Sequence, residues 1–189
     1  MLETVNITGI ILAGGKSSRM GMDKGFILWE GKPFVNHIID ALKPLAKDIL
    51  IVSDHPQYDT LGYKRIKDIL PEAGPLAGLY SGLSASKTEL NVVLSCDVPL
   101  ITSELLRALL LSYNKENDAV VCKVNDKLMP LVAIYTKKCE VMCLELLQQD
   151  ERRMMQLIKK LNQVQFLSLN EFEANQVKNI NSPTELKQI

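Results

Sequence analysis

Residues 12–24, LAGGKSSRMGMDK, combine glycines with basic side chains directly after a short apolar run. The glycines allow a ligand to approach the backbone closely and leave amide N–H groups accessible. This segment contains three basic residues, Lys16, Arg19 and Lys24, and one acid, Asp23. Amides and cations in a loop at the end of a strand suit a polyphosphate. The segment matches neither the P-loop pattern nor G-x-G-x-x-G, so a basic surface turn without a ligand is the alternative interpretation.

A lone carboxylate, Asp97, follows the apolar run of residues 91–95 and precedes Val98 and Pro99. Proline cannot continue a strand, so we expect the carboxylate to be presented at the strand end. Proteins usually hold Mg²⁺ with one or two carboxylates, while substrate phosphates and water complete the octahedron. Asp97 is therefore a candidate metal ligand. The alternative is that it caps a helix beginning near Thr102.

Three further polar residues lie just before a helix start or a loop. Asn179 and Asn181 flank Ile180 just before a proline-containing helix start. On a strand their side chains would point to the same face, although asparagine is also common in simple turns before a helix. Asp68 precedes a glycine-containing loop and is otherwise an ordinary loop acid.

The order of residues in LAGGKSSRMGMDK resembles the signature loop of nucleotidyltransferases with the nucleotide-diphospho-sugar transferase fold. In particular it is similar to the molybdenum cofactor guanylyltransferase (MobA) family. Later blocks resemble that family in the same order and extend the resemblance over nearly the whole chain: PEAGPLAGL at 71–79, SCDVPL at 95–100, DERRM at 150–154 and NINSPTEL at 179–186. The double glycine at Gly14 and Gly15, the GPLAG block and the N-x-N-[ST]-P block favour the guanylyl branch.

The resemblance implies transfer of GMP from GTP to the terminal phosphate of molybdopterin, with release of pyrophosphate. It implies that Arg19, Lys24 and Asp97 are catalytic and that Asp97 binds Mg²⁺. Nucleotide binding is implied for Leu12, Ala13, Gly14, Gly15, Lys24, Asp68, Gly74, Gly78 and Asp97, and acceptor binding for Arg152, Arg153, Asn179 and Asn181. The family often has an asparagine near the end of strand 49–52 that contacts the nucleotide. This chain has Ser53 there, which could replace that hydrogen bond.

Other functions remain open from the sequence. A molybdopterin cytidylyltransferase or a sugar-phosphate nucleotidyltransferase of the same fold would use similar blocks. A non-catalytic GTP-binding module is a further alternative, but the presence of Arg19, Lys24 and Asp97 together favours catalysis. With GTP and molybdopterin as substrates, transient contacts with molybdenum-insertion proteins and target molybdoenzymes would follow from the resemblance.

The composition excludes several classes. The 22 basic and 22 acidic residues balance, which argues against a protein that coats nucleic acid. No apolar run approaches the roughly 20 residues that span a bilayer, and the N-terminus resembles a first strand more than a secretion signal. The four cysteines form no C-x-x-C pair and the two histidines lie far apart, which argues against a zinc site or a disulfide framework. We expect a cytoplasmic monomer.

Short apolar runs alternate with helical patterns from end to end, which predicts one α/β domain over residues 1–189. The fold class we expect is a three-layer αβα arrangement around a mostly parallel twisted sheet, the Rossmann-like nucleotidyltransferase fold. Residues 1–100 would bind the nucleotide and residues 101–189 the acceptor. Strands are expected at 7–12, 49–52, 64–66, 91–95, 119–124, 131–135, 164–169 and 177–180, and helices at 33–42, 76–85, 102–113, 137–148, 152–160 and from 182.

Overall fold

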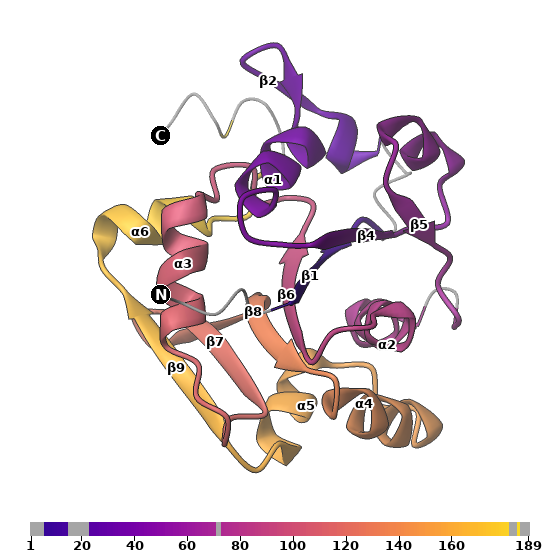
Figure 1. The fold of residues 1–189 in the computed structure, drawn as a ribbon, viewed down its shortest axis with the longest axis vertical. Helices are drawn as coiled ribbons and strands as arrows, with labels where there is room; N and C mark the ends of the chain where they lie inside the picture. Colours follow the sequence, from indigo (N-terminus) through magenta and orange to yellow (C-terminus); the bar gives the residue numbers. More distant parts are fainter. Residues whose placement is uncertain (1–5, 15–22, 71–72, 182–184, 186–189) are drawn as a thin grey trace.

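A seven-stranded sheet runs through the molecule (Figure 1). The computed structural model describes residues 6–14, 23–70, 73–181 and 185. In spatial order the strands are β5 (Lys64–Ile66), β4 (Asp48–Val52), β1 (Ile7–Leu12), β6 (Leu90–Ser95), β8 (Lys127–Thr136), β7 (Ala119–Val124) and β9 (Val164–Leu169). The first four are parallel, as are β7 and β9, whereas β8 is antiparallel to both of its neighbours. The predicted mostly parallel sheet is confirmed.

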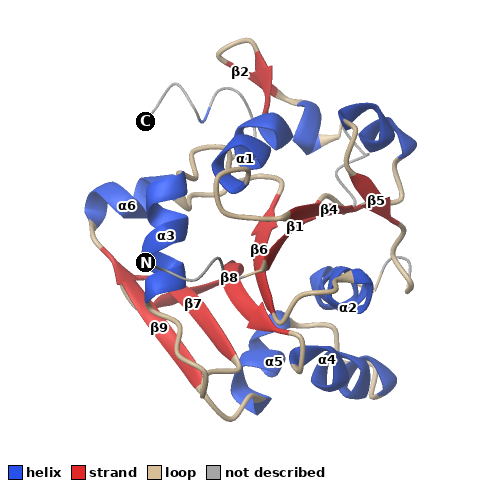
Figure 2. Cartoon of the chain, viewed as in Figure 1, coloured by secondary structure: helices blue, strands red, loops and turns tan. Residues whose placement is uncertain are grey.

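Helices cover both faces of this sheet, which confirms the three-layer prediction (Figure 2). One face carries α1 (Phe34–Leu42), α3 (Ser103–Leu111) and the short α6 (Glu171–Gln176), and the other carries α2 (Pro75–Ala85), α4 (Cys139–Gln148) and α5 (Met154–Lys160). The buried residues divide accordingly into two clusters, one on each side of the strands. Each cluster is a separate apolar layer between helices and sheet.

The strand β1 shows why these elements form. All six of its residues are buried, as expected for a strand covered on both faces. Successive side chains alternate, so Ile11 packs in the cluster under α1 and α3, while Ile10 and Leu12 pack in the cluster under α2. Because β4 and β6 lie on either side of β1, the strand order reverses there, and ligands of open α/β sheets bind beyond the carboxyl ends at such a point.

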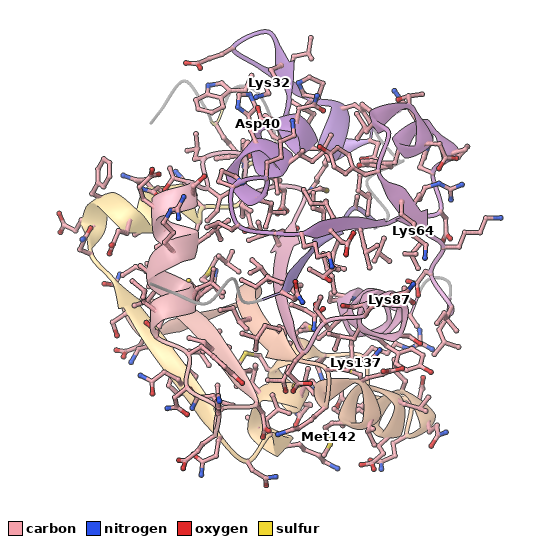
Figure 3. The ribbon with its side chains drawn as sticks, in the orientation of Figure 1. Lys32, Asp40, Lys64, Lys87, Lys137 and Met142 are labelled. Atoms are coloured by element: carbon pink, nitrogen blue, oxygen red, sulfur yellow. The ribbon has the colours of Figure 1, made fainter. Side chains whose placement is uncertain are left out.

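The helix α2 is fixed at its end by a cation. Lys137, which follows β8, directs its ammonium group to the carbonyl oxygens of Leu83 and Ser84, 3.2 Å away in the latter case (Figure 3). A positive charge near the last carbonyls of a helix is favourable. On the opposite side of the molecule Lys32 forms an ion pair with Asp40 of α1.

A small hairpin was not predicted. Strands β2 (Leu28–Trp29) and β3 (Lys32–Pro33) pair through a turn in which Glu30 and Gly31 have φ of 47° and 74°. Two positive φ values are typical of the tight turns that match strand twist. With only two residues on each side, the hairpin lacks the alternating apolar run that makes a strand visible in sequence.

The strand predicted at 177–180 is wrong. The structure has α6 before it, with a capping box between Asn170 and Glu173, and no strand at 177–180. Val177 and Ile180 are both buried, but they lie three residues apart, which is not the alternation that a strand needs. The argument that Asn179 and Asn181 share a strand face therefore fails. The helix start predicted at Ser182 lies outside the described residues.

Within the described ranges, no helix has the length and apolar character needed to cross a membrane. All four cysteines are buried as free thiols. Thr102 caps the start of α3, because its hydroxyl accepts a hydrogen bond from the Leu105 N–H.

Candidate functional site

Three side chains from distant parts of the chain meet at the carboxyl end of the sheet. The Lys24 ammonium donates to Asn181 Oδ1 at 2.6 Å and lies 4.0 Å from Asp97 Oδ2. Lys24 and Asn181 are 157 residues apart in sequence. All three were selected from the sequence, and the structure brings them together.

The strands explain this meeting. β1 and β6 are parallel neighbours in which Leu12 pairs with Ser95, so the chain leaves both strands at the same edge. The Cys96 N–H donates to the Leu12 carbonyl at 3.0 Å, and the Ala13 N–H donates to Val52 of β4 at 2.9 Å. Gly14 follows at the surface, with nothing within 4 Å of the position where a Cβ would stand. The backbone at Ala13 and Gly14 is thus next to Asp97.

Asp97 has the features of a ligand rather than a helix cap. Thr102 itself caps α3, which leaves the alternative role for Asp97 without support. Its Oδ1 is buried and has no hydrogen-bond partner, a property shared in the described residues only by two neutral asparagine oxygens, of Asn36 and Asn91. An unpaired buried carboxylate oxygen is costly unless a cation completes it. The donor set therefore fits a hard cation such as Mg²⁺, bound by one carboxylate together with substrate oxygens.

The segment that follows Asp97 is tied to the C-terminal part of the chain. The backbone carbonyl of Asp97 accepts from the Ile180 N–H at 2.7 Å. Ile180 is fully buried, whereas Asn179 is exposed. This hydrogen bond and the burial of Ile180, and not a strand ladder, hold the segment that carries Asn181 beside Lys24. Within the described residues no group of three or more His, Cys, Asp or Glu side chains is placed to share a metal ion.

Lys24 stands in a short 3-10 helix, Lys24–Phe26, that Asp23 caps. Asp23 Oδ1 accepts from the Gly25 N–H at 2.9 Å and from the Tyr58 hydroxyl at 2.5 Å. The cap could have been recognised in the sequence, because aspartate is a preferred N-cap residue. Tyr58 could not, since a tyrosine 35 residues away gives no local signal.

The start of α2 lies against the DERRM block. Gly74 precedes this helix with φ of 80°, and a Cβ there would stand 3.6 Å from the Arg152 carbonyl oxygen. The side chains of Arg152 and Arg153 are exposed and form ion pairs with Asp150 and Glu151 at 2.9 Å and 2.5 Å. The hydrogen bond from Arg153 lowers the pKa of Glu151 to about 2.

Asp68 is partly buried beside α2. Its Oδ1 accepts from the Ser81 hydroxyl at 2.9 Å and from the Leu70 N–H at 3.2 Å. Burial raises the pKa of Asp68 above its usual value, against the effect of these two hydrogen bonds. Ser81 also accepts from the Ile69 N–H, so it fixes the loop that carries Asp68.

Some predicted residues have another visible role. Gly78 faces the sheet, where a Cβ would stand 3.5 Å from Leu12 and 3.9 Å from Val52, so its contacts are with the core. Ser53 is buried and its hydroxyl accepts from the His55 N–H at 3.1 Å. Gly15 and Arg19 lie outside the described residues. Nucleotide contacts by Leu12, Gly74 and Gly78 stay predictions.

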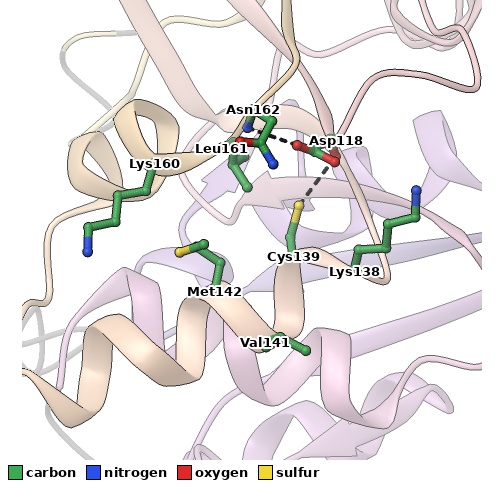
Figure 4. A pocket seen from close by; sticks show the side chains of 8 residues that line it. All are labelled: Asp118, Lys138, Cys139, Val141, Met142, Lys160, Leu161 and Asn162. Atoms are coloured by element: carbon green, nitrogen blue, oxygen red, sulfur yellow. Dashed lines mark hydrogen bonds between the residues drawn. The ribbon is translucent and has the colours of Figure 1, made fainter.

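A surface pocket of about 260 Å³ lies elsewhere, at the opposite end of the sheet (Figure 4). Its lining residues are Asp118, Lys138, Cys139, Val141, Met142, Lys160, Leu161 and Asn162. The Asp118 carboxylate accepts from the Asn162 N–H at 3.0 Å, and the Cys139 thiol donates to the Asp118 carbonyl at 3.3 Å. Burial raises the pKa of Cys139 to about 12, so this thiol is not a nucleophile at neutral pH.

Known proteins resemble this chain in sequence. A family profile described as a MobA-like NTP transferase domain matches residues 9–164. A probable molybdenum cofactor guanylyltransferase of Flavobacterium johnsoniae is 41% identical over 183 residues, which is 97% of this chain and 96% of the relative. A molybdenum cofactor guanylyltransferase of Yersinia pseudotuberculosis is 36% identical over 188 residues, covering 95% and 93% of the two chains.

Solved structures resemble it in fold. Molybdopterin-guanine dinucleotide biosynthesis protein A of Archaeoglobus fulgidus superimposes with a TM-score of 0.79 at 24% identity, over 96% of this chain and 95% of that one. A 4-diphosphocytidyl-2C-methyl-D-erythritol synthase of Anaerococcus prevotii gives 0.75 at 14% identity, over 98% and 94%. These similarities are of fold alone and agree with the predicted nucleotidyltransferase architecture.

Proposed function

Because the chain belongs to the MobA-like NTP transferase family, we propose that it is a molybdenum cofactor guanylyltransferase. It transfers GMP from GTP to the phosphate of molybdopterin, giving the guanine dinucleotide cofactor and pyrophosphate. The observation that carries the proposal is the meeting of Lys24, Asp97 and Asn181 at the carboxyl end of the sheet. A relative that is 41% identical over nearly the whole chain supports the choice of substrates.

The reaction needs positioning and charge neutralisation more than a base. An oxygen of the acceptor phosphate attacks the α-phosphorus of GTP, and the bond to the β-phosphate oxygen breaks to release pyrophosphate. The acceptor oxygen is already anionic, so no proton has to be removed. The main barrier is the approach of an anion to a triphosphate, which cations in fixed positions lower.

Lys24 would neutralise the β- and γ-phosphates. The Lys24 side chain is 29% exposed, and its ammonium group lies between Asn181 and Asp97. Asn181 accepts a hydrogen bond from one of the three N–H groups of the Lys24 ammonium and so orients the other two donors. Arg19, five residues before Lys24 in the sequence, would act in the same way.

Asp97 would hold Mg²⁺ through the oxygen that has no partner in the protein, and that ion, when bound, supplies Lewis acidity at the α-phosphate. The backbone of Ala13 and Gly14 would contact the nucleotide beside Asp97, since nothing obstructs Gly14. Arg152, Arg153 and Asn179 would contact the acceptor.

Asp68 would read the guanine base. Guanine presents an N1–H and a 2-amino group, and both are donors that a carboxylate accepts. Since the Ser81 and Leu70 hydrogen bonds both go to Oδ1, Oδ2 would be the oxygen that meets the base. Cytosine lacks this pair of adjacent donors, so Asp68 would favour GTP over CTP.

The test is a nucleotide panel. Wild-type protein is incubated with Mg²⁺, molybdopterin and each of GTP, CTP, ATP and UTP, and the dinucleotide is detected by mass. We expect product with GTP, a much smaller amount with CTP, and none when Mg²⁺ is chelated. Asp68→Asn serves as the specificity control. It should lower the ratio of the product formed from GTP to the product formed from CTP.

Other outcomes would replace the proposal. Product with CTP alone would identify a cytidylyltransferase, and product only with a sugar phosphate as acceptor would change the acceptor class. Nucleotide binding without pyrophosphate release for any acceptor would identify a non-catalytic module.

A further inference from the structure

Tyr58 is a fully buried tyrosine in a segment to which the reaction assigns no role. It belongs to the 3-10 helix Pro56–Leu61, between β4 and β5, and none of its surface is exposed. Its hydroxyl donates to Asp23 Oδ1 at 2.5 Å. A buried phenol needs a partner for its hydroxyl, but a short hydrogen bond to a carboxylate next to the Lys24 turn is more than packing requires.

The hydrogen bond reaches the turn through one oxygen atom. Asp23 Oδ1 accepts from Tyr58 and also from the Gly25 N–H, at 2.9 Å. The Phe26 N–H donates to the Asp23 carbonyl at 3.0 Å, and the Ile27 N–H donates to the Lys24 carbonyl at 3.1 Å. Lys24 is therefore enclosed in a turn whose geometry depends on the orientation of Asp23.

The residues on the other side of Lys24 touch Tyr58 directly. The ring centroids of Phe26 and Tyr58 are 4.8 Å apart. A Cβ at Gly25 would clash with the Tyr58 hydroxyl, so only glycine allows this approach. The turn is thus fitted against the phenol on both sides of the lysine.

Tyr58 also borders the second catalytic segment. Burial raises the pKa of Tyr58 far above its usual value, and Cys96 and Asp23 raise it further, because both lie close to the hydroxyl. Cys96 immediately precedes Asp97. The phenol therefore stays protonated at neutral pH, and it belongs to the same buried cluster as Cys96.

We propose that Tyr58 is a positioning residue that holds Lys24 against Asp97 and Asn181 through Asp23 and the turn at Gly25. It does not touch substrate. This inference rests on the proposed function, because it assumes that Lys24 acts on the nucleotide phosphates. Small displacements of a catalytic group by a distant change can reduce the rate by up to about 10²-fold.

The chain provides a matched control for a loss of stability alone. Tyr135 is also fully buried, and its hydroxyl also makes one hydrogen bond, to the Pro130 carbonyl at 2.8 Å, on β8 away from Lys24. Tyr58→Phe and Tyr135→Phe each remove one buried hydroxyl. We expect both to lower the melting temperature by about 2–4 °C, the shift for one hydrogen bond in a protein of this size.

Only Tyr58→Phe should affect the reaction. We expect its kcat to fall about 10- to 100-fold, with the KM for the acceptor unchanged, while Tyr135→Phe keeps the wild-type kcat. Asp23→Asn keeps an oxygen that can accept both hydrogen bonds and should retain most of the activity, whereas Asp23→Ala should resemble Tyr58→Phe. Equal kcat values for Tyr58→Phe and Tyr135→Phe would overturn the inference.

A double-mutant cycle separates positioning from a general effect. Affinity for the Mg²⁺–nucleotide is measured for wild type, Tyr58→Phe, Lys24→Ala and the double variant. If Tyr58 acts through Lys24, Tyr58→Phe weakens binding in the wild-type background and has no further effect beside Lys24→Ala. Independent, additive losses would contradict the inference.

The two proposals fail in different ways. If the wild type binds or transfers a nucleotide other than GMP, the guanylyl assignment fails, and the cycle is carried out with that nucleotide. A wild-type protein that binds no nucleoside triphosphate would overturn both.

Discussion

Polar side chains at the two ends of the sheet differ in how completely they are hydrogen-bonded. At the amino ends of β1 and β6, the Thr88 hydroxyl lies 2.8 Å from the Thr8 hydroxyl and 2.9 Å from the Leu90 carbonyl. The nearby Asp118 carboxylate accepts from two backbone N–H groups, at 3.0 Å and 3.3 Å. At the carboxyl ends, the buried Oδ1 of Asp97 has no hydrogen-bond partner, and its Oδ2 lies 4.0 Å from the Lys24 ammonium.

This difference distinguishes polar groups that stabilise the fold from polar groups that can bind a ligand. Polar groups that satisfy the backbone or one another stabilise the fold and have little capacity left for a ligand. A charged group that is buried and incompletely paired lowers stability in the free protein and binds strongly to whatever completes it. Two carboxylates, one at each end, should therefore respond in opposite ways to the same substitution.

The largest expected effect is at these two aspartates. Asp97→Ala should lower turnover by at least about 10²-fold, as loss of one fixed charge in a transition-state site does. Because it removes an unpaired buried charge, its melting temperature should stay equal or rise. Asp118→Ala should keep turnover and lose about 0.5–1.5 kcal/mol of stability, because two exposed N–H groups exchange their carboxylate acceptor for water. Turnover by pyrophosphate release and thermal melting check both.

If Asp97→Ala behaved as expected for Asp118→Ala, the two ends of the sheet would not differ in function. Asp97→Ala with normal turnover, or with the stability loss expected for Asp118→Ala, would mean that Asp97 serves the fold. Asp97→Asn in parallel separates the charge from the shape of the side chain.

An intermediate effect is expected at two glycines of α2 that face different residues of β1. A Cβ at Gly82 would stand 2.6 Å from Ile10 Cγ2 in the fully buried strand, whereas one at Gly78 would have ordinary contact with Leu12 at 3.5 Å. Gly82→Ala should destabilise the protein by about 1–3 kcal/mol through overpacking. Gly78→Ala should gain up to about 1 kcal/mol from helix propensity. Denaturant unfolding measures both.

The same pair tests the nucleotide role predicted for Gly78. Since its contacts are with Leu12 and Val52, we expect Gly78→Ala to keep its affinity for GTP. A clear loss of affinity at unchanged stability would instead support a direct nucleotide contact.

The smallest effect is expected at exposed charges. Arg153→Ala should leave the melting temperature unchanged, because an exposed ion pair contributes little. It should raise the KM for the phosphorylated acceptor by about 2- to 5-fold at low salt, an effect that vanishes as salt screens the charge. Lys138→Ala, at the opposite end of the sheet, should change neither value. Equal effects on KM would show that Arg153 contributes only net charge.

The pH dependence of this pair follows from Glu151. Its pKa is lowered to about 2 by Arg153, so the ion pair is complete above the ordinary value of 4.5 and is lost only as the pH falls toward 2. Acceptor KM should therefore not change between pH 5 and 8 through Glu151.

Local patterns predicted most of the fold and the core of the site. Continuous apolar runs identified β1 and β6, and the polar residues directly after them identified Asp97 and the Lys24 loop. The rule that parallel strands present their carboxyl ends together made these residues candidates, and the resemblance to the MobA family supplied their roles. The strand predicted at 177–180 is wrong, because Val177 and Ile180 are buried without forming a strand and a backbone hydrogen bond to Asp97 holds that segment.

Contacts between distant segments could not be predicted. Tyr58 and Ser81 act on Asp23 and Asp68 across 35 and 13 residues, and neither has a neighbour in sequence that suggests this. The hairpin β2–β3 has too few residues to form a pattern. Sequence alone located the groups that could react, while the structure was needed to find the groups that hold them.

The bond between Lys24 and Asn181 has a consequence for biosynthesis. A ribosome must add 157 further residues after Lys24 before its partner exists. The nascent chain can form the β1–β4–β6 part of the sheet early, but its lysine stays unanchored until the segment that carries Asn181 emerges. Catalytic competence therefore arrives only after residue 181 has been added, and a chain terminated before it would lack this anchor even if the sheet had folded.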